Sequence, residues 1–220
     1  MVLGSGPIRI GQGIEFDYSC VRGVRALRNA GETVAMVNSN PETVSTDYDT
    51  ANILFFEPLT KECLNEILHW TSAKGFVAQL GGQTPINLSK DLIGLGYKMY
   101  GSSLDTVDLA EERSKFAEIC RELDFAIPKA TAAENLEQAL ANEAKIPYPI
   151  ICRPSYVLGG RRMEVIESQD ELINYFNRYG AFFNSEKPCL MDQFLTGALE
   201  VDVDLVRGND WIVVGGIVEH

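Results

Sequence analysis

The sequence has few of the residues that build metal sites and nucleophilic triads. It contains two histidines, His69 and His220, and neither lies near a cysteine in the sequence. The five cysteines are far apart and form no C-x-x-C pair. These shortages argue against a zinc site, a disulfide framework and a Ser-His-Asp or Cys-His mechanism. Scattered buried thiols in a reducing cytoplasm are the simplest interpretation.

Long apolar runs and a basic surplus are also missing. No stretch approaches the ~20 apolar residues of a membrane span, and the first residues lack the pattern of a signal peptide. The net charge of −12 argues against sequence-independent nucleic-acid binding, which needs a basic surface. It leaves room for a nucleotide ligand, because a local arginine cluster can bind phosphate in an acidic protein. We therefore expect a cytoplasmic protein with neither a nucleic-acid nor a membrane partner.

The first half alternates between patterns typical of strands and of helices. With 220 residues, 45% of them hydrophobic, the chain suits one large globular domain or two modest ones. Apolar runs that favour strands occur at 1–3, 33–37, 75–79 and 98–100. Helical spacing falls between them, at 18–29, at 61–71 and from 85 through 92. Strands separated by helices of this length predict an α/β fold with a Rossmann-like, doubly wound parallel sheet.

After Ser103 the pattern changes to α+β. Helices are predicted at 111–123, 134–145 and 169–179, and alternating residues at 198–206 turn into an antiparallel partner at 211–215. We place the boundary near residue 110, which gives domains 1–110 and 111–220. Both ends of the sequence look cut, so we expect a piece of a longer polypeptide.

One segment, Arg153-Pro-Ser-Tyr-Val-Leu-Gly-Gly-Arg161, combines a strand end, an arginine and a glycine pair. A fixed cation beside bare glycine N–H groups suits a loop that closes over a polyphosphate. A hairpin whose arginines face water explains the same residues. The segment alone leaves both interpretations open.

The glycine loop from Gly4 to Gly13 resembles a dinucleotide fingerprint, but Arg9 stands where the third glycine belongs. A generic loop after the first strand is therefore favoured over NAD binding. Glu15 and Asp17 could line a polar site near Arg9, or could form the acidic first turn of a helix. Their spacing favours the helix.

Three acidic residues, Glu200, Asp202 and Asp204, share one face of the alternating segment. Metal ligation is one interpretation, but a single strand of alternating acids is more often a solvated face. The solvated face is favoured, and nucleotide contact by one of the three stays open.

Four motifs together resemble the large subunit of carbamoyl phosphate synthetase. They are Gly6-Pro-Ile-Arg-Ile-Gly-Gln-Gly-Ile-Glu-Phe-Asp-Tyr18, Asn40-Pro-Glu-Thr-Val-Ser-Thr-Asp-Tyr-Asp49, Gly81-Gly-Gln-Thr-Pro85 and the Arg153–Arg161 segment. The similarity runs along the whole chain, and the first two motifs match the second of the family's two homologous halves. It implies a pre-ATP-grasp domain followed by the N-terminal part of an ATP-grasp domain.

The resemblance implies a ligase that makes carbamoyl phosphate from bicarbonate, glutamine-derived ammonia and ATP, for arginine and pyrimidine biosynthesis. The second half would bind ATP and phosphorylate carbamate, and the first half would phosphorylate bicarbonate. The alternative is a non-catalytic binding or regulatory module with the Gly4–Gly13 loop as its ligand site. Deletion of residues 111–220 would separate the two, because only the module would still bind its ligand.

The resemblance also implies roles for individual residues. Arg153, helped by Arg113, would contact the ATP phosphates as the catalytic arginines, and Gly159 and Gly160 would lie in the loop that covers them. Main-chain groups near Gln193 and Leu195 would hold adenine, and Glu200 would accept the ribose hydroxyls. Gln193 departs from the histidine expected there, which puts its side-chain role in doubt. Arg9 and Glu15 match residues that line a carbamate tunnel.

The implied cofactors are ATP with Mg²⁺ or Mn²⁺, and K⁺ in the complete enzyme. Partners would be a glutaminase small subunit or domain and the first synthetase half, in an assembly that is oligomeric when intact. The family's metal ligands are expected beyond residue 220, so this chain would hold no metal. For the same reason we expect the isolated chain to be inactive.

Overall fold

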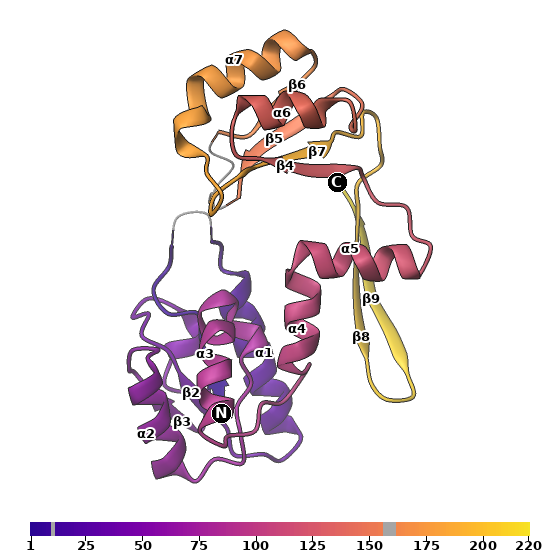
Figure 1. The fold of residues 1–220 in the computed structure, drawn as a ribbon. Helices are drawn as coiled ribbons and strands as arrows, with labels where there is room; N and C mark the ends of the chain where they lie inside the picture. The colour runs from indigo at the N-terminus through magenta and orange to yellow at the C-terminus, as the bar shows by residue number, and fades with distance from the viewer. Residues whose placement is uncertain (10–11, 156–161) are drawn as a thin grey trace. The chain divides into compact units, whose positions relative to one another are not determined.

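The computed structural model describes residues 1–9, 12–155 and 162–220, and the backbone alone of 113 and 114. The chain folds as two compact units, Met1–Phe125 and Ala126–His220 (Figure 1). No helix among the described residues is long and apolar enough to cross a membrane.

The first unit is built on a parallel sheet, as the sequence predicted. Strands β1 (Val2–Leu3), β2 (Ala35–Val37) and β3 (Ile53–Phe55) lie in the order β1-β2-β3. On the far side of β1, single parallel bridges join Val77 to Val2 and Met99 to Phe76. The chain thus extends the sheet first to one side of β1 and then to the other. Such a reversal is where open α/β sheets bind ligands, at the carboxyl ends of their strands.

Helices cover this sheet with their apolar faces. They are α1 (Glu15–Asn29), α2 (Lys61–Thr71) and α3 (Gln83–Gly94), with short 3-10 turns η1 (Val44–Thr46) and η2 (Gln79–Gly81). The predicted bounds of α2 are confirmed: the Thr60 hydroxyl accepts a hydrogen bond from the Cys63 N–H, and Leu64 and Leu68 are buried one turn apart. A C-cap in the left-handed region, Ser72, ends the helix.

The helix predicted at 111–123 is confirmed as the second of two consecutive helices in this region. They are α4 (Leu104–Glu111) and α5 (Arg113–Glu122), and the backbone of Glu112 between them is extended, with ψ of 109°. Ser103 caps α4 through a hydrogen bond from the Thr106 N–H. Residues 104–110 were not predicted as a helix; Leu104, Val107 and Leu109 are apolar there, but α4 buries none of its residues.

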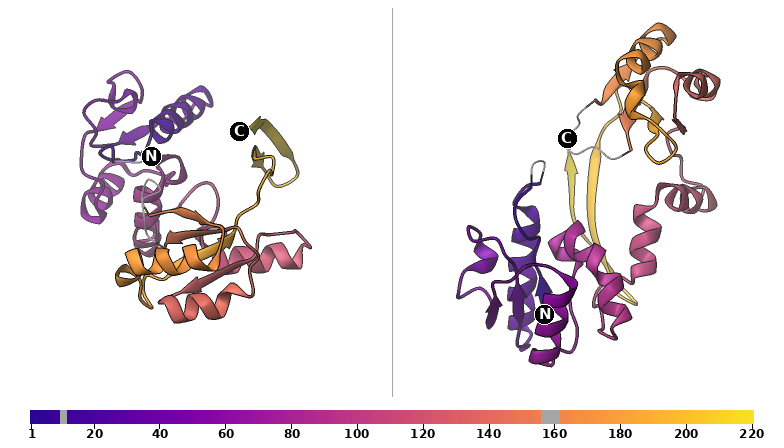
Figure 2. Two further views of the ribbon diagram at one scale, coloured as in Figure 1. Left: turned by 90° about the horizontal axis from the view of Figure 1, so that it is seen from above. Right: turned by 60° about the vertical axis from the view of Figure 1, so that its left-hand side comes forward.

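The second unit contains an antiparallel sheet with helices on one face. The strands are β4 (Ala130–Ala133), β5 (Ile150–Pro154), β6 (Glu164–Ile166) and β7 (Cys189–Gln193), in the order β4-β7-β5-β6. Helices α6 (Leu136–Glu143) and α7 (Gln169–Tyr179), with the turn η3 (Gly180–Phe182), cover one face (Figures 1 and 2). This confirms the α+β prediction for the second half.

The core of the second unit lies between that face and the helices. Alternate residues of β5 and β7 point into it, and Ile150, Cys152, Cys189 and Met191 are fully buried there against Tyr175. The period of two then places Ile151, Arg153, Leu190 and Asp192 on the opposite face. No helix of the second unit covers this opposite face in the described part of the chain (Figure 1). We call it the open face.

A β-hairpin ends the described chain. Strands β8 (Val201–Arg207) and β9 (Ile212–Glu219) pair with each other only, and a bulge lies next to Leu205. Both predicted strands are confirmed, although β9 is longer than the run at 211–215.

Candidate functional site

Arg153 and Asp192 form an ion pair on the open face of the second unit. The two residues lie diagonally across the β5–β7 pairing, where Arg153 is opposite Leu190 and Asp192 is opposite Ile151. Nε and Nη2 of Arg153 donate to Oδ2 of Asp192 at 3.1 and 2.9 Å. The Asp192 side chain is 12% exposed and that of Arg153 36%. The buried carboxylate therefore orients the guanidinium, whose other N–H donors have no partner among the described residues and are available to a ligand.

The two ends of the Arg153–Arg161 segment are anchored to the second unit. Ser155 follows β5, and both its N–H and its hydroxyl donate to the carbonyl oxygen of Pro188. At the other end, the Tyr175 hydroxyl donates to the carbonyl oxygen of Arg162 at 2.8 Å. The Arg162 guanidinium lies 3.7 Å from the centroid of the Phe182 ring. Gly159 and Gly160, the predicted phosphate-covering glycines, lie outside the described residues.

The predicted adenine-binding residues lie at the end of β7, with Gln193 as its last residue and Leu195 beyond it. The N–H of Gln193 donates to the Lys129 carbonyl at 2.8 Å, and its side-chain oxygen accepts from the Lys129 N–H at 3.4 Å. The N–H of Phe194 donates to the Pro149 carbonyl. The two bonds to Lys129 hold Gln193 beside the start of β4. The N–H of Gln193 is therefore already used within the fold. Leu195, two residues on, is 51% exposed.

Glu200 is exposed immediately before β8, and its carbonyl accepts the N–H of His220 at 3.0 Å. On the same face of the hairpin, Nε2 of His220 lies 2.8 Å from Oδ2 of Asp202. Nowhere in the described chain do three or more His, Cys, Asp or Glu side chains gather as metal ligands do. The acidic strand thus has an ionic partner of its own in His220.

The His220–Asp202 pair gives a testable pH dependence. The hydrogen bond to Asp202 raises the pKa of His220 above its ordinary 6.5. A raised pKa means that this contact stabilises the hairpin end below about pH 6.5 and is lost as pH rises through the higher value. We expect an NMR titration of the His220 ring to have its midpoint above 6.5. Asp202→Asn should return it toward 6.5 and Asp204→Asn should not; a wild-type midpoint at or below 6.5 would contradict the assignment.

Arg113 is the first residue of α5, and its side chain is not described. Arg113 falls in the first unit and Arg153 in the second. Whether the two arginines act together on one phosphate chain stays a prediction.

Arg9 and Glu15 lie at the carboxyl end of the first unit's sheet. Arg9 is exposed, and its carbonyl accepts the N–H of Gln12. Glu15 opens α1, and its carboxylate accepts the N–H of Gly13 at 3.2 Å. A carboxylate in this position satisfies a free amide at a helix start and is stabilised by the helix dipole, as the spacing suggested. The tunnel role stays a prediction.

A polar network beneath this loop was not predicted. Asn38, 1% exposed after β2, accepts the Gly6 N–H at 3.0 Å and donates to the Ser45 hydroxyl at 2.9 Å. The Ser45 N–H in turn donates to Asp17 at 3.2 Å. Gly4 must lack a side chain, because a Cβ there would lie 2.5 Å from Cγ of Asn38. An asparagine directly after a buried strand was the sequence signal that could have revealed this network.

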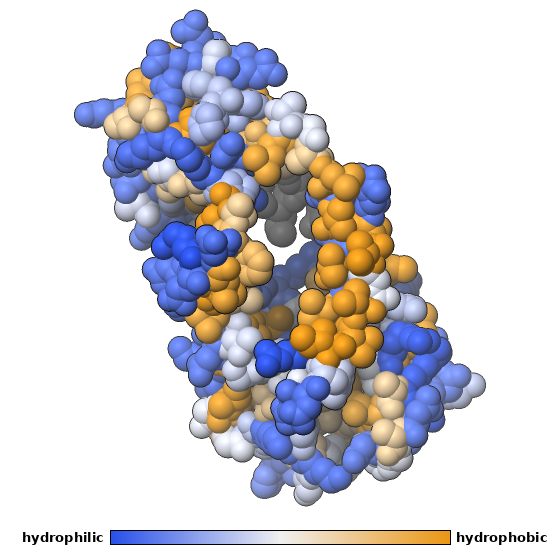
Figure 3. All heavy atoms as spheres, turned by 90° about the vertical axis from the view of Figure 1, so that its right-hand side faces the viewer, coloured by the Kyte–Doolittle hydropathy of each residue, from blue (hydrophilic) through white to orange (hydrophobic). Residues whose placement is uncertain are grey.

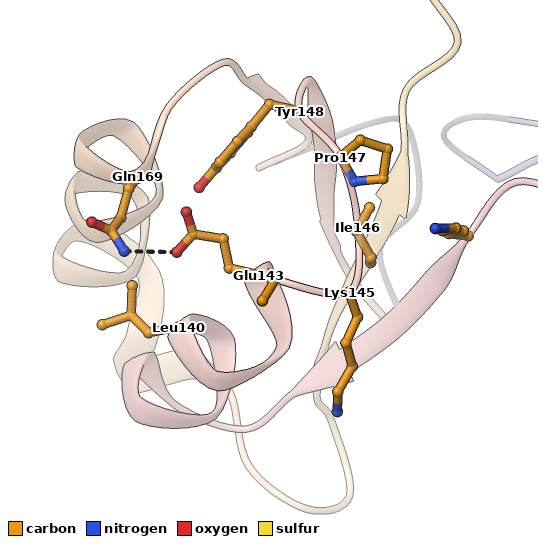
Figure 4. Close-up of a pocket in the computed structure, with 9 residues that line it drawn as sticks. Leu140, Glu143, Lys145, Ile146, Pro147, Tyr148 and Gln169 are labelled. Carbon is orange, nitrogen blue, oxygen red and sulfur yellow. Dashed lines mark hydrogen bonds between the residues drawn. The ribbon is translucent and has the colours of Figure 1, made fainter.

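Two surface hollows lie apart from these residues. One, of about 570 Å³, is in the second unit beside α6, and in Figure 4 Gln169 donates to Glu143 at 2.8 Å while the Tyr148 hydroxyl points toward the same carboxylate. Burial raises the pKa of Tyr148, and the nearby Glu143 carboxylate raises it further. The other, of about 660 Å³, lies in the first unit around Gly31, Ser72 and Tyr100. Lys129, the hydrogen-bond partner of Gln193, lines the first hollow, but none of the predicted site residues that the structure describes lines either one.

Comparison with known families accounts for both halves of the chain. A family model described as the carbamoyl phosphate synthase preATP-grasp domain matches residues 1–109. A second, described as the ATP binding domain of the carbamoyl-phosphate synthase L chain, matches residues 112–217. The two matches meet where the sequence pattern changed, whereas the compact units divide after Phe125.

Relatives from distant organisms match over the full chain. The carbamoyl phosphate synthase large chains of Gemmatimonas aurantiaca, Deinococcus deserti and Archaeoglobus fulgidus are 47%, 48% and 46% identical over 220 residues. Each alignment covers 100% of this chain but 20 or 21% of the relative. The chain therefore spans about a fifth of the length of these relatives.

Solved structures agree on the fold. N5-carboxyaminoimidazole ribonucleotide synthetase from Thermus thermophilus superposes with a TM-score of 0.67 at 13% identity, over 99% of this chain and 53% of that one. The biotin carboxylase domain of Hydrogenobacter thermophilus 2-oxoglutarate carboxylase, solved with MgADP, ADP and bicarbonate, gives 0.67 at 14% identity, over 99% and 49%. At such low identity these likenesses show the fold alone.

The parallel sheet followed by the antiparallel sheet with its open face defines the class: this is the architecture of ATP-grasp ligases with their preceding domain. Within that class, the chain belongs to the carbamoyl phosphate synthase large-chain family. The resemblance seen in the four sequence motifs is thereby confirmed.

Proposed function

We propose that the chain is part of a ligase that makes carbamoyl phosphate from bicarbonate, glutamine-derived ammonia and ATP, and that it comes from the half that phosphorylates carbamate. The observation that carries the proposal is the Arg153–Asp192 pair: a guanidinium fixed by a buried carboxylate on the open sheet face, in the region matched as an ATP binding domain. The residues of the Gly6–Tyr18 and Asn40–Asp49 motifs support the assignment of the chain to the second of the family's two halves.

In the proposed reaction a carbamate oxygen attacks the γ-phosphorus of ATP in line. The new O–P bond forms as the bond from phosphorus to the β,γ-bridging oxygen breaks, and ADP leaves with that electron pair. Arg153 would donate to the phosphate oxygens and neutralise their charge. Asp192 holds the guanidinium in one orientation, so little side-chain entropy is lost at the moment of transfer. Arg113, Gly159 and Gly160 would complete the phosphate contacts.

For the nucleoside we propose main-chain contacts from the Gln193–Leu195 stretch and ribose contacts from Glu200. Because the Gln193 N–H already bonds to Lys129, an adenine contact would use other main-chain groups of this stretch. The exposed Glu200 carboxylate suits hydroxyl donors. Arg9 and Glu15 would line the path of carbamate.

A divalent cation is the implied partner of the nucleotide, and a solved ATP-grasp relative holds MgADP. The described residues do not provide a set of metal ligands, so we assign none of them to Mg²⁺, Mn²⁺ or K⁺. We further propose residues 1–110 and 111–220 as the functional domains. A glutaminase subunit or domain and a first synthetase half would act with them in the cytoplasm, in arginine and pyrimidine biosynthesis.

The proposal predicts that the isolated 220-residue chain binds ATP but does not turn it over. Titration calorimetry should detect ATP binding, with no heat from NADH at the same concentrations. The purified chain should yield no ATP from ADP and carbamoyl phosphate in a luciferase assay, because it spans a fifth of its relatives' length. Absence of ATP binding would overturn the nucleotide assignment, and ATP formation would overturn the predicted inactivity.

A further inference from the structure

Three sulfur-containing side chains lie together in the core of the second unit. Cys152 on β5 is paired with Met191 on β7, and Cys189 lies two residues before Met191 on the same strand. All three are on the covered face of the sheet, and each is 0% exposed. The surface of this unit, at the top of Figure 3, is mostly hydrophilic, and the sulfur residues lie beneath it. The nucleotide site proposed above lies on the other face and does not use them.

The spacing of the two cysteines is unsuitable for a disulfide. They are diagonal neighbours, because Cys152 is paired with Met191 and Cys189 with Pro154. Diagonal Cα atoms of an antiparallel pair are about 7–8 Å apart, whereas a disulfide needs Cα atoms about 4.4–6.8 Å apart and sulfurs at about 2 Å. The thiols are nevertheless close to each other, since the Cys189 thiol, together with burial, raises the pKa of Cys152.

A metal ion between two sulfurs fits this spacing better than a direct bond. Metal–thiolate bonds are about 2.3 Å long, so two sulfurs on one ion can lie up to about 4.6 Å apart. Met191 offers a thioether from the position opposite Cys152, where paired Cβ atoms are about 5 Å apart.

The three sulfurs select a soft ion. Thiolate and thioether ligands favour Cu(I), whereas Mg²⁺ and Ca²⁺ prefer oxygen. Structural Zn²⁺ sites have four ligands, and no third His, Cys, Asp or Glu side chain joins the two cysteines in the part of the chain that the structure describes.

We infer that Cys152, Cys189 and Met191 form a binding site for one Cu(I) ion in the core of the second unit. Binding replaces the two thiol protons: Cu⁺ and two R–SH give [Cu(SR)₂]⁻ and two H⁺, and Met191 adds a neutral donor. No electron is transferred, so the step needs no oxidant or reductant. Because the ligands are fully buried, the ion enters when the core opens, and we expect slow binding. The site does not depend on the nucleotide site proposed above.

The test is an anaerobic titration of the 220-residue chain with Cu(I) buffered by bicinchoninate, left to equilibrate at each step. All samples carry Cys63→Ser, which removes a partly exposed thiol. The chain should take up one Cu(I). Cys152→Ser and Cys189→Ser should each lower its affinity by more than the roughly 10- to 100-fold that loss of an outer-shell partner costs. Met191→Leu, which nearly conserves the side-chain volume, should lower it several-fold.

Cys20→Ser is the matched control. Cys20 is also 0% exposed and shares a core cluster with a methionine, Met36, but that cluster contains no second cysteine among the described residues. The Cu(I) affinity of this variant should equal that of the parent chain. Thermal unfolding without copper shows whether any of the serine variants has lost its fold, and Met191→Leu keeps the inference testable if one has.

X-ray absorption at the copper edge identifies the ligands independently of affinity. The loaded chain should show two or three sulfur neighbours, and Cys152→Ser should lose one of them. Failure to take up Cu(I), equal affinities of Cys152→Ser and Cys20→Ser, or nitrogen and oxygen neighbours at the copper would each overturn the inference and leave the three residues as core packing. A Cys152–Cys189 disulfide formed by diamide in the folded chain would contradict the spacing on which the site rests.

Discussion

Replacing Arg153 with alanine is expected to lower the affinity of the chain for ATP by about 10- to 100-fold. Hydrogen bonds to charged groups contribute about 1.5–3 kcal/mol each, and a guanidinium held at 2.9–3.1 Å from Asp192 is already oriented for the phosphates. Titration calorimetry with ATP measures the change directly. Arg153→Lys should fall between wild type and alanine, since it keeps the charge but loses the planar fork.

The matched control is Arg178→Ala. Arg178 lies on α7 in the same unit and is likewise paired with a carboxylate, Glu164, at 2.6 Å, so both variants remove one positive charge and one ion pair. If Arg178→Ala weakens ATP binding as much as Arg153→Ala does, the effect is a general one of charge. Equal ATP affinity of wild type and Arg153→Ala would refute the phosphate role outright. Thermal unfolding of each variant shows whether the loss of Asp192's partner has changed the fold instead.

The parts of the fold that could be predicted are those whose causes are local. The helix at 61–71 has its cap, its apolar stripe and its left-handed end within a dozen residues, and its bounds were predicted correctly. Strand β3 was missed for the opposite reason. It has three residues, Ile53 at its start is 39% exposed, and it becomes a strand only because β2 is there to pair with it.

In the candidate site, too, features with local causes could be predicted and features that depend on distant residues could not. Arg153 could be singled out because an arginine before a glycine pair signals phosphate chemistry in the sequence. Its orientation could not, since Asp192 is 39 residues away and the contact depends on the register of β5 against β7. Asn38 was overlooked because its importance comes from Gly6 and Ser45, which only the fold brings to it. The sequence thus identifies which side chains can bind or react with a ligand. The contacts that orient those side chains depend on the tertiary structure and could not be predicted.

Tyr175 is the residue whose removal is expected to damage the second unit most. It is fully buried in the core, stacks on Phe183 at 6.1 Å between ring centroids, and meets Phe176 and Tyr179 edge-on. Truncating such a side chain costs about 3–5 kcal/mol, a large part of the stability of a small domain. Tyr175→Ala should therefore unfold the second unit at a markedly lower denaturant concentration. Hydrogen exchange followed residue by residue would show whether the first unit keeps its protection.

The more informative variant is Tyr175→Phe, which removes only the hydroxyl that donates to the Arg162 carbonyl. Burial raises the pKa of Tyr175, so the hydroxyl stays a protonated donor across the usual pH range. Its loss should cost about 1 kcal/mol of stability. It should also weaken ATP binding, because the bond anchors the chain directly after the Arg153–Arg161 segment.

Tyr97→Phe is the control for this variant, since the Tyr97 hydroxyl bonds to Asn65 within the first unit at 2.9 Å. Both variants lose a tyrosine hydrogen bond, but only Tyr175→Phe releases an end of the proposed phosphate loop. Equal ATP affinities of the two variants would show that the hydrogen bond from Tyr175 to the Arg162 carbonyl does not help to bind ATP. A selective loss in Tyr175→Phe would instead show that core packing in the second unit sets the position of the loop, and so link the stability of the fold to the binding of its nucleotide.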